Sequence, residues 1–372
     1  MDENIKSIVD SRYKIAGIDE LKKKLDSYPS FEEWKQGKNA FCFYGHNQYS
    51  RNVQISGLKG AFESLGIPFY IIYYGNEARF KELSHHKNIF ILSNESLLSG
   101  IDPIIKKNNC KILLFWRYYD DTPNEILAPK IGETEKKVID KYKRYIVFVV
   151  SELSYEGNKR FLRGYVQDFG IPVMTFPWGV DIKRHVPVEC KPKKDVFYIG
   201  TYHEKAKRID DYFEKVIRRH THTIIGPDWQ RSPFRWLSNS IMGIDEFNEK
   251  ISELYSSHLV SLSIHHDFEV NGYSCNERVF NAIACGGFVV SDATARIREL
   301  FSEDEIVTAN DPYEYFEKAA SFIEHPEMRI PYMEKAIMKI YANHTYHHRV
   351  IDLLSVILTG TPQTPFCPVL NS

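Results

Sequence analysis

The sequence predicts an α/β fold with two domains, each built on a parallel sheet that is covered by helices. Three observations support this. The chain has 372 residues, enough for two domains. Short apolar runs that end at turn residues alternate with helix-length polar segments, which is typical of a parallel sheet covered on both faces. This rhythm breaks once, at residues 181–195, where two prolines and five basic residues indicate an interdomain linker.

Before the rhythm begins, residues 1–38 are polar with helical spacing of apolar side chains. We expect them to form a helical cap on the first domain, docked by Ile18, Leu21, Leu25 and Trp34. A helix that binds a partner or a membrane surface is the alternative, but the segment lacks the strong basic face of a membrane binder.

The first domain then spans 39–182. Its expected strands lie at 40–44, 68–74, 87–92, 111–116, 145–150 and 173–176, with helices at 53–65 and 158–169.

The second domain is expected to span 183–345. Its strands lie at 196–199, 221–225, 259–264, 287–290 and 306–308, and its helices at 208–218, 244–255, 276–285, 312–325 and 331–342. The remaining segment, 346–372, is expected to form a helix at 347–358 and an irregular tail that packs back on the first domain. The two halves share an order of strands and helices but no sequence repeat.

Composition excludes some classes of function. The 48 basic and 49 acidic side chains nearly cancel, which argues against a general nucleic-acid coat. Aromatic residues make up 14% of the chain, and a core built with Phe and Tyr explains them better than a stacking or sugar-binding surface does. The six cysteines form no CxxC pair, no signal pattern opens the chain and no apolar run is long enough to span a bilayer. We expect a cytoplasmic protein, with peripheral membrane association as the alternative.

Ligands of parallel sheets bind at the carboxyl ends of the strands, so the loops after strands are the places to search. In the loop from Gly200 to Arg208, the glycine permits close backbone approach, while Lys205, Lys207 and Arg208 are suited to neutralise a phosphate. A solvated charge run at a helix start is the alternative. In the next loop, Trp229 offers a ring for stacking, or else packs under its own loop.

A third loop, 264–276, holds Gly272 and leads into a helix that we expect to begin near Ser274. Free backbone N–H groups and the positive dipole end at a helix start favour an anion such as a diphosphate. Glu277 falls at the third position after Ser274, as in a capping box, and accepting hydrogen bonds from ribose is its alternative role. Arg278 is expected to contact phosphate, or else to pair with an acid on the helix.

Three loops of the first half carry candidate side chains. His46 follows the first strand and is a candidate base or sugar-hydroxyl partner, with a structural role as the alternative. Arg117, in the loop after the fourth strand, and Glu152, after the fifth, are candidates for the acceptor side. The acid pair Asp120-Asp121 has the wrong spacing for a metal-binding D-x-D motif, so no metal site is expected.

Several stretches together resemble a known family. Residues 276–292, NERVFNAIACGGFVVSD, and the following Ile297-Arg-Glu-Leu-Phe301 resemble the glycosyl transferases group 1 region of CgeB-like glycosyltransferases. The H-T-Y-x-x-R of that family is matched at His344–Arg349. Phe176–Asp181 is similar to the P-x-G-V-D that ends the first domain of many two-domain retaining glycosyltransferases, and 197–208 is similar to their F-I-G-S…R loop.

This resemblance implies the GT-B fold, with two Rossmann-like domains whose parallel sheets face an interdomain cleft. It implies a nucleoside-diphosphate sugar bound mainly on the second domain, and no cofactor. The implied donor-binding residues are Gly45, Gly200, Thr201, Tyr202, Lys205, Arg208, Gly226, Trp229, Gly243, Tyr273, Ser274, Cys275, Asn276, Glu277 and Arg278. The candidate catalytic residues are His46, Asp267 and Glu269, and the acceptor-side candidates are Asn47, Arg117, Glu152 and Trp178.

One departure concerns the acid pair of related retaining enzymes, E-x₇-E. Tyr273 and Asn281 stand in those two places, so the pair is absent in register. Glu277, one turn before Asn281, is the candidate for the ribose contact, and Asp267 or Glu269 for the other acid. Retention of stereochemistry at the sugar, without a metal, is the expectation that follows from the resemblance, and the departure leaves it open.

The sequence therefore predicts a glycosyltransferase that moves a sugar from a nucleoside-diphosphate sugar to a carbohydrate, lipid-linked or protein acceptor. A sugar-nucleotide epimerase or hydrolase, and a non-catalytic sugar-nucleotide-binding protein, are the alternatives. Nucleic acid is disfavoured as the acceptor because the chain has no basic stripe.

Overall fold

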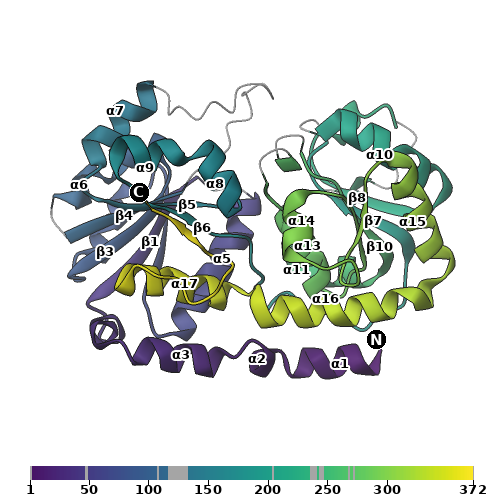
Figure 1. Cartoon of the computed structure of the whole chain (residues 1–372), viewed down its shortest axis with the longest axis horizontal. Coiled ribbons are helices and arrows are strands. Elements are labelled where there is room, and N and C mark those ends of the chain that lie inside the picture. Colours follow the sequence, from purple (N-terminus) through teal and green to yellow (C-terminus); the bar gives the residue numbers. More distant parts are fainter. Residues whose placement is uncertain are drawn as a thin grey trace. The chain divides into compact units, whose positions relative to one another are not determined.

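The computed structural model describes residues 2–46, 49–106, 109–115, 133–202, 205–234, 241–242, 247–266, 269–270 and 273–371, without the side chains of 49–53, 241–242 and 247–249. The chain forms two compact units. The C-terminal unit comprises Met1–Gly17 and Ile182–Thr345, and the N-terminal unit comprises Ile18–Asp181 and Tyr346–Ser372. The chain therefore passes from one unit to the other three times. In each unit, helices flank a central sheet (Figure 1).

The N-terminal unit has a seven-stranded sheet of order β13-β6-β5-β4-β3-β1-β2. All neighbouring strands are parallel except β13, which is antiparallel to β6. The strands are β1 (Asn39–Gly45), β2 (Phe69–Tyr73), β3 (Asn88–Ser93), β4 (Asn109–Phe115), β5 (Ile146–Ser151), β6 (Val173–Thr175) and β13 (Val369–Leu370). The helices are α3 (Ile18–Asp26), α4 (Glu32–Lys35), α5 (Tyr49–Ser64), α6 (Asp102–Ile105), α7 (Glu133–Tyr142), α8 (Tyr155–Phe161), α9 (Arg163–Phe169) and α17 (Tyr346–Thr359), with 3-10 helices at Pro29–Phe31, Glu77–Leu83 and Glu95–Ile101.

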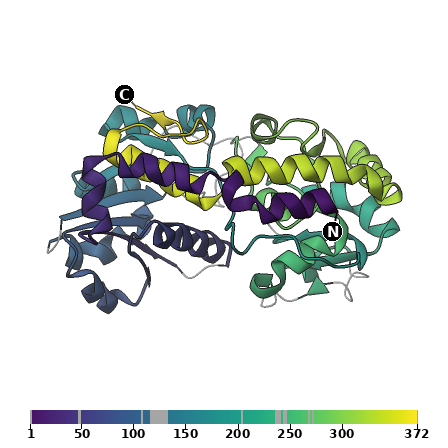
Figure 2. The ribbon, with the colours of Figure 1, turned by 90° about the horizontal axis from the view of Figure 1, so that it is seen from below.

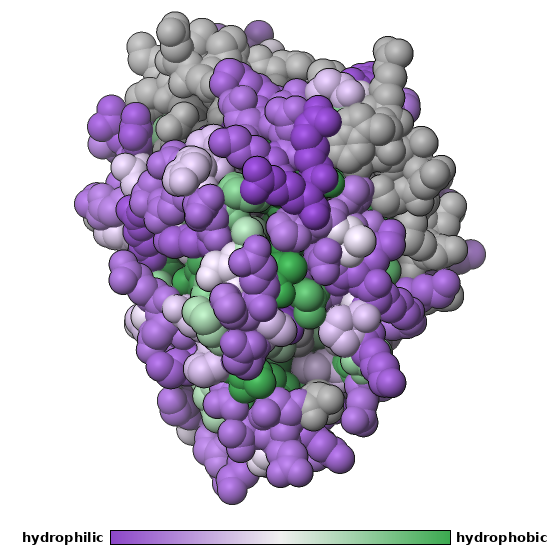
Figure 3. All heavy atoms as spheres, turned by 90° about the vertical axis from the view of Figure 1, so that its right-hand side faces the viewer, coloured by the Kyte–Doolittle hydropathy of each residue, from purple (hydrophilic) through white to green (hydrophobic). Residues whose placement is uncertain are grey.

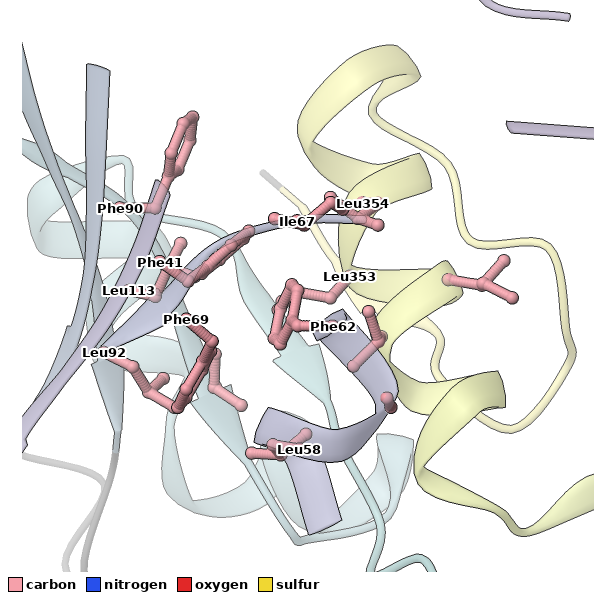
Figure 4. Close-up of a cluster of buried hydrophobic side chains, with 14 of the residues drawn as sticks. Phe41, Leu58, Phe62, Ile67, Phe69, Phe90, Leu92, Leu113, Leu353 and Leu354 are labelled. Atoms are coloured by element: carbon pink, nitrogen blue, oxygen red, sulfur yellow. The ribbon is translucent and has the colours of Figure 1, made fainter. Parts of the chain in front are cut away.

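Aromatic side chains build much of the core of this unit, which agrees with the interpretation of the high aromatic content. Phe41 of β1 packs against Phe62 of α5 with ring centroids 4.2 Å apart, and the ring of Trp34 stacks on Phe41 at 5.3 Å. Leu353 and Leu354 of α17 lie in the same buried cluster (Figure 4). The last helix of the chain therefore completes the core of the first domain.

The C-terminal unit has a six-stranded sheet, parallel throughout, of order β12-β11-β10-β7-β8-β9. The strands are β7 (Lys194–Ile199), β8 (His222–Ile225), β9 (Ile241–Met242), β10 (His258–Ser263), β11 (Val289–Asp292) and β12 (Val307–Ala309). The helices are α1 (Glu3–Asp10), α2 (Arg12–Ile15), α10 (Ala206–Arg219), α11 (Phe247–Ser256), α13 (Glu277–Ala284), α14 (Ala295–Leu300), α15 (Pro312–Glu324) and α16 (Ile330–Asn343), with 3-10 helices at Trp229–Arg231 and Pro326–Arg329.

The face of this unit drawn in Figure 3 is largely hydrophilic, with small hydrophobic areas between the polar side chains. Among its helices, only scattered large apolar side chains are exposed, such as Tyr313, Met328 and Met338. None of the helices in the described part of the chain is both long and apolar enough to cross a bilayer.

The first 38 residues do not form one cap, which corrects the expectation. Ile5 and Val9 of α1 are buried in the C-terminal unit, where α1 packs on α16 (Figure 2). Arg12 Nε also donates to the carbonyl of Ile182, at 3.0 Å. From α3 onward the segment belongs to the N-terminal unit, where Leu25 and Trp34 are buried. Amphipathic spacing shows which side of a helix is buried, but it does not show which partner covers that side.

Candidate functional site

In the C-terminal unit, charged side chains gather at the carboxyl ends of three neighbouring strands. β10 lies between β7 and β11, so the residues after these strands meet at one edge of the sheet. Lys205 and Arg208 follow β7, Glu269 follows β10, and Asp292 is the last residue of β11. These are the described residues from which the candidate site is built.

Three cations converge on the end of β10. The carbonyl of Ile264 accepts from Lys205 Nζ at 3.4 Å and from Arg278 Nη1 at 3.3 Å. Arg208 Nε donates to the next carbonyl, that of His265, at 3.1 Å, and Arg278 Nε donates to the carbonyl of Ile199 on β7. The predicted cations are therefore brought together, although they come from segments about 70 residues apart.

Two carboxylates lie among these cations and remain ionised. Asp292, only 1% exposed, accepts from Arg208 Nη2 at 2.5 Å. Burial alone would raise the pKa of Asp292, but His265 and Arg208 outweigh it and lower the pKa to about 2. Glu269 accepts from the His266 N–H at 2.6 Å and lies 3.5 Å from Lys205 Nζ. Burial opposes ionisation here as well, but Lys205 and the other nearby cations keep the pKa of Glu269 below its ordinary value.

Asp292 also controls the start of α13, through His265. The carboxylate accepts from the His265 backbone N–H at 3.0 Å and pairs with Nδ1 at 2.8 Å. Nε2 of the same ring accepts the backbone N–H of Asn276 at 3.3 Å. Because Nε2 accepts this bond, the ring donates to Asp292 from Nδ1. One buried carboxylate thus fixes both the Arg208 guanidinium and the residue that precedes α13.

Gly200 and Gly226 allow the loops after β7 and β8 to pack against each other. A Cβ on Gly226 would clash with the Gly200 carbonyl, and a Cβ on Gly200 would lie 2.5 Å from Arg278 Nη2 and 2.7 Å from Tyr198 Oη. The Trp229 indole Nε1 donates to the Gly200 carbonyl at 2.9 Å. These glycines therefore have a packing role, whether or not a ligand approaches them.

Two aromatic residues predicted to bind the donor are core residues instead. Trp229 is 2% exposed, and its ring packs against Tyr198 and Tyr202. Tyr202 is also buried and donates its hydroxyl to Asp210 at 3.0 Å. The expectation that Trp229 stacks on a ligand is wrong, because the hydrogen bond to Gly200 holds the indole under the loop.

The helix after β10 begins later than predicted. α13 starts at Glu277, and its N-cap residue is Asn276, whose side chain makes no capping hydrogen bond. Ser274 and Cys275 are buried in the preceding loop, where the Ser274 N–H donates to the carbonyl of Glu269 at 3.2 Å and Tyr273 adopts a φ of 58°. Glu277 is thus in the first turn but not at the third position, so the predicted capping box is absent. The left-handed turn at Tyr273 delays the helix.

Comparison with known proteins identifies this architecture. Residues 206–355, less than half of the chain, match the family model described as "Glycosyl transferase-like". No curated protein sequence matches the chain. Among solved structures, sucrose-phosphate synthase from Thermosynechococcus elongatus is similar over 86% of this chain and 98% of its own, at 12% identity and a TM-score of 0.60.

Two other structures show the same similarity. Anabaena HepE in complex with UDP-glucose matches over 85% of this chain and 99% of its own, at 12% identity and a TM-score of 0.56. The β-glucosyltransferase of T4 phage in complex with UDP and Mn²⁺ matches over 86% and 99%, at 12% identity and a TM-score of 0.58. The chain has the GT-B fold. The stretch that matches the glycosyl transferase-like model lies mostly in its C-terminal unit.

In the N-terminal unit of this GT-B chain, the predicted residues lie at the ends of different strands. Gly45 ends β1, where a Cβ would clash with the ring of Phe43. His46 is exposed, and its ring lies 5.2 Å from that of Tyr74. Glu152 follows β5 and is half-buried, as is Trp178. In the C-terminal unit, Thr201 is half-buried after β7. Asn47, Arg117, Gly243 and Asp267 lie outside the described residues.

Two motifs that suggested the GT-B fold contact each other within the N-terminal unit. Arg349, from the H-T-Y-x-x-R stretch, donates from Nε to the carbonyl of Pro177 at 2.8 Å and from Nη2 to that of Trp178 at 3.2 Å. The backbone N–H of Tyr346 donates to the carbonyl of Val180 at 3.0 Å. These hydrogen bonds therefore join the segment that leaves this unit to the segment that re-enters it. The sequences of the two motifs do not reveal this role.

The sequence reasoning did not single out His265 and Asp292 as site residues. Both follow apolar runs that end at the edge of the sheet, so the rule that directed attention to Lys205 and Arg208 also applies to them. In the sequence, however, neither residue belongs to a basic cluster or a Gly-rich turn, which were the patterns that indicated the other candidates. Within the part of the chain that the structure describes, no three His, Cys, Asp or Glu side chains form a group suited to a metal ion.

Proposed function

We propose that the protein is a glycosyltransferase that moves a sugar from a UDP-sugar to a carbohydrate, lipid-linked or protein acceptor. The observation that carries the proposal is the convergence of Lys205, Arg208 and Arg278 at the carboxyl ends of β7 and β10. The glycosyl transferase-like match includes Arg208 and Arg278. The structures of HepE and the T4 phage enzyme are complexes with UDP-glucose and with UDP, which supports uridine as the nucleoside of the donor.

In this proposal the cations stabilise the diphosphate as it leaves the sugar. Charge that develops on a leaving group is best stabilised by donors that are already in position and shielded from water. The Lys205 side chain is 10% exposed and is held by Glu269 and the Ile264 carbonyl. Arg278 Nη2 makes no hydrogen bond to the described residues and lies beside Gly200, which has no side chain to cover it. Lys205 and Arg278 are thus placed before the donor arrives.

The carboxylates of this cluster serve the cations in the proposed mechanism. Glu269, whose pKa is lowered chiefly by Lys205 against the effect of burial, remains ionised and is unsuited to donate a proton. Asp292 fixes Arg208 in the same way. His46 stays the candidate base or hydroxyl partner, and Asn47, Arg117, Glu152 and Trp178 stay candidates for the acceptor side. Asp267 stays the second candidate acid.

The finer parts of the proposal are CgeB-like membership, retention at the sugar and independence from metal. The first rests on the motifs at 276–301 and 344–349. Retention rests on the same resemblance. Metal independence rests on the three cations, which supply the charge that a divalent ion would otherwise bring to the diphosphate. If it holds, turnover of a UDP-sugar in excess EDTA will equal turnover in Mg²⁺ or Mn²⁺, and a tenfold loss in EDTA would overturn that part.

Titration calorimetry with UDP tests the central proposal. Arg278→Met removes a guanidinium that is partly committed to main-chain carbonyls and partly open. We expect UDP affinity to fall by about 10- to 100-fold, since a hydrogen bond to a charged group contributes about 1.5–3 kcal/mol. The control is Arg218→Met on α10, which removes an exposed guanidinium paired with Glu214. Absence of UDP binding to the wild-type protein, or equal affinity in both variants, would contradict the assignment.

A further inference from the structure

Arg296 is a buried arginine whose hydrogen-bonding groups are mostly unused. It lies in the first turn of α14, directly after β11, and is 4% exposed. Nη1 donates to Glu299 Oε2 at 2.7 Å, a carboxylate whose own side chain is 55% exposed. Nε and Nη2 are buried and have no hydrogen-bond partner among the described residues. A buried donor without a partner lowers the stability of a fold, and a charged one lowers it more.

A half-buried arginine of the same unit contrasts with this state. Arg329 Nε donates to the Pro326 carbonyl at 3.0 Å and Nη1 to the Leu259 carbonyl at 2.5 Å. Main-chain carbonyls of this unit therefore do accept from a guanidinium that is partly removed from solvent. Arg296 lacks such acceptors on two of its three nitrogens, and packing alone gives no reason for a guanidinium at this position.

The geometry of the free groups indicates what they are suited to bind. In a guanidinium, the N–H of Nε and one N–H of Nη2 point in the same direction, along one edge of the plane. This edge donates two parallel hydrogen bonds and matches the two oxygens of a carboxylate or of a phosphate. Glu299 occupies Nη1, at the other end of the group, and so leaves the edge intact. The unpaired edge of Arg296 is thus a complete fork for an oxyanion.

The place of Arg296 in the fold relates it to the proposed donor site. Asp292, which holds Arg208, closes β11, and Arg296 follows it by four residues at the same edge of the sheet. Lys205 and Arg278 bond to carbonyls that follow or end β10 and β7, and β7 lies on the opposite side of β10 from β11. Neighbouring strands are about 4.8 Å apart, so the backbone that carries Arg296 begins about one strand spacing from β10 along the row of strand ends.

We propose that Arg296 binds an oxyanion of the substrate other than the diphosphate: a carboxylate or phosphate group on the sugar part. The inference rests on the proposed function, because it takes the diphosphate to lie on Lys205, Arg208 and Arg278. The hydroxyl oxygens of a neutral hexose can accept from a guanidinium but carry no charge, whereas a carboxylate or phosphate matches both the charge and the fork, so the position favours sugars that carry a negative charge. That charge is on either the transferred sugar or the acceptor sugar, and the chemistry that recognises it is the same.

Calorimetry with UDP, UDP-glucose and UDP-glucuronate tests whether the charge is on the transferred sugar (the donor arm of the test). In the wild-type protein we expect UDP-glucuronate to bind at least tenfold more tightly than UDP-glucose. Arg296→Met removes this preference and leaves the affinity for UDP unchanged, and Arg296→Lys, which keeps the charge but not the fork, restores only part of it. The control is Arg298→Met on the same helix, where the arginine is exposed and bonded to Asn310, and it keeps the full preference.

The acceptor arm uses the protein saturated with UDP and titrated with glucose, glucose 6-phosphate and glucuronate. A preference for the charged sugars that is lost in Arg296→Met assigns the fork to the acceptor. If UDP binds but neither arm shows a preference dependent on Arg296, the inference is overturned while the proposed function stands. If UDP itself does not bind, the proposed function fails first.

Thermal unfolding of the ligand-free variants separates binding from a structural role. Arg296→Met removes two unpaired buried donors, so we expect its Tm to equal or exceed that of the wild type. A fall of several degrees, with the preference for charged sugars unchanged, would show that the guanidinium stabilises the fold, and would overturn the inference.

Discussion

At the scale of single residues, Asp292 connects several parts of the candidate site. It joins Arg208, His265 and, through His265, the backbone at Asn276. Removing one partner of a buried charge pair is strongly destabilising, because the other charge remains buried and unpaired. The position of Arg208, a cation of the proposed donor site, and the start of α13 therefore depend on the same carboxylate.

Asp292→Asn tests this connection. The amide keeps the shape but loses the charge, and its NH₂ group faces either Arg208 or His265, both of which donate. We expect the free energy of unfolding in urea to fall by about 3–5 kcal/mol and UDP affinity to fall as well. Asp304→Asn, at an exposed pair with Lys335, serves as the control, and we expect little change there. Equal stability of the two variants would contradict the role of Asp292.

The low pKa of Asp292 predicts a dependence of stability on pH. Its folded value of about 2 is below the ordinary value of 3.8, so the unfolded chain takes up this proton first as the pH falls. The contribution of Asp292 is complete above about pH 4 and is lost between about pH 4 and 2. In urea titrations from pH 5 to 3, stability should therefore fall less steeply in Asp292→Asn than in the wild type, and parallel curves would contradict this.

At the scale of elements, the loops after β7 and β8 form one unit through their glycines. Gly226→Ala places a methyl group against the Gly200 carbonyl, at a φ of 147° that disfavours side chains. We expect a lower Tm and weaker UDP binding, because the Gly200 loop lies beside Arg278. Gly60→Ala, in the exposed part of α5 with no atom within 4 Å, is the control and should stabilise by about 0.4–1 kcal/mol. A similar Tm change in both variants would argue against loop packing.

How far the sequence predicted these elements depends on the kind of signal. The position of Lys205, Arg208 and Arg278 near the ends of strands was predictable, because the alternation of strands, loops and helices and the basic side chains are local features of the sequence. The delayed start of α13 was not, since Tyr273 takes a left-handed conformation that its residue type rarely adopts. The burial of Trp229 was not predictable either, because it depends on a hydrogen bond to Gly200, in a loop 29 residues away. Contacts of this kind decide between a binding surface and a core, and local patterns do not contain them.

At the scale of the whole molecule, the N-terminal segment serves both units, and this yields a paired prediction. Val9→Asp places a charge in the buried contact of the C-terminal unit, and Leu25→Asp does the same in the N-terminal unit. Hydrogen exchange followed by mass spectrometry should show faster exchange mainly in β7–β12 for the first variant and in β1–β6 for the second. If both variants loosen the same unit, the division at Gly17 is contradicted.

The three passages of the chain between the units have a consequence for the evolution and engineering of the protein. Neither unit is a continuous stretch of the gene, since each is assembled from two separate segments. A recombination event with one breakpoint cannot transplant the half that carries Lys205, Arg208 and Arg278 into another protein. A chimaera that exchanges the C-terminal unit needs three junctions, after Gly17, Asp181 and Thr345, and must bring the first helices along with the sheet they cover.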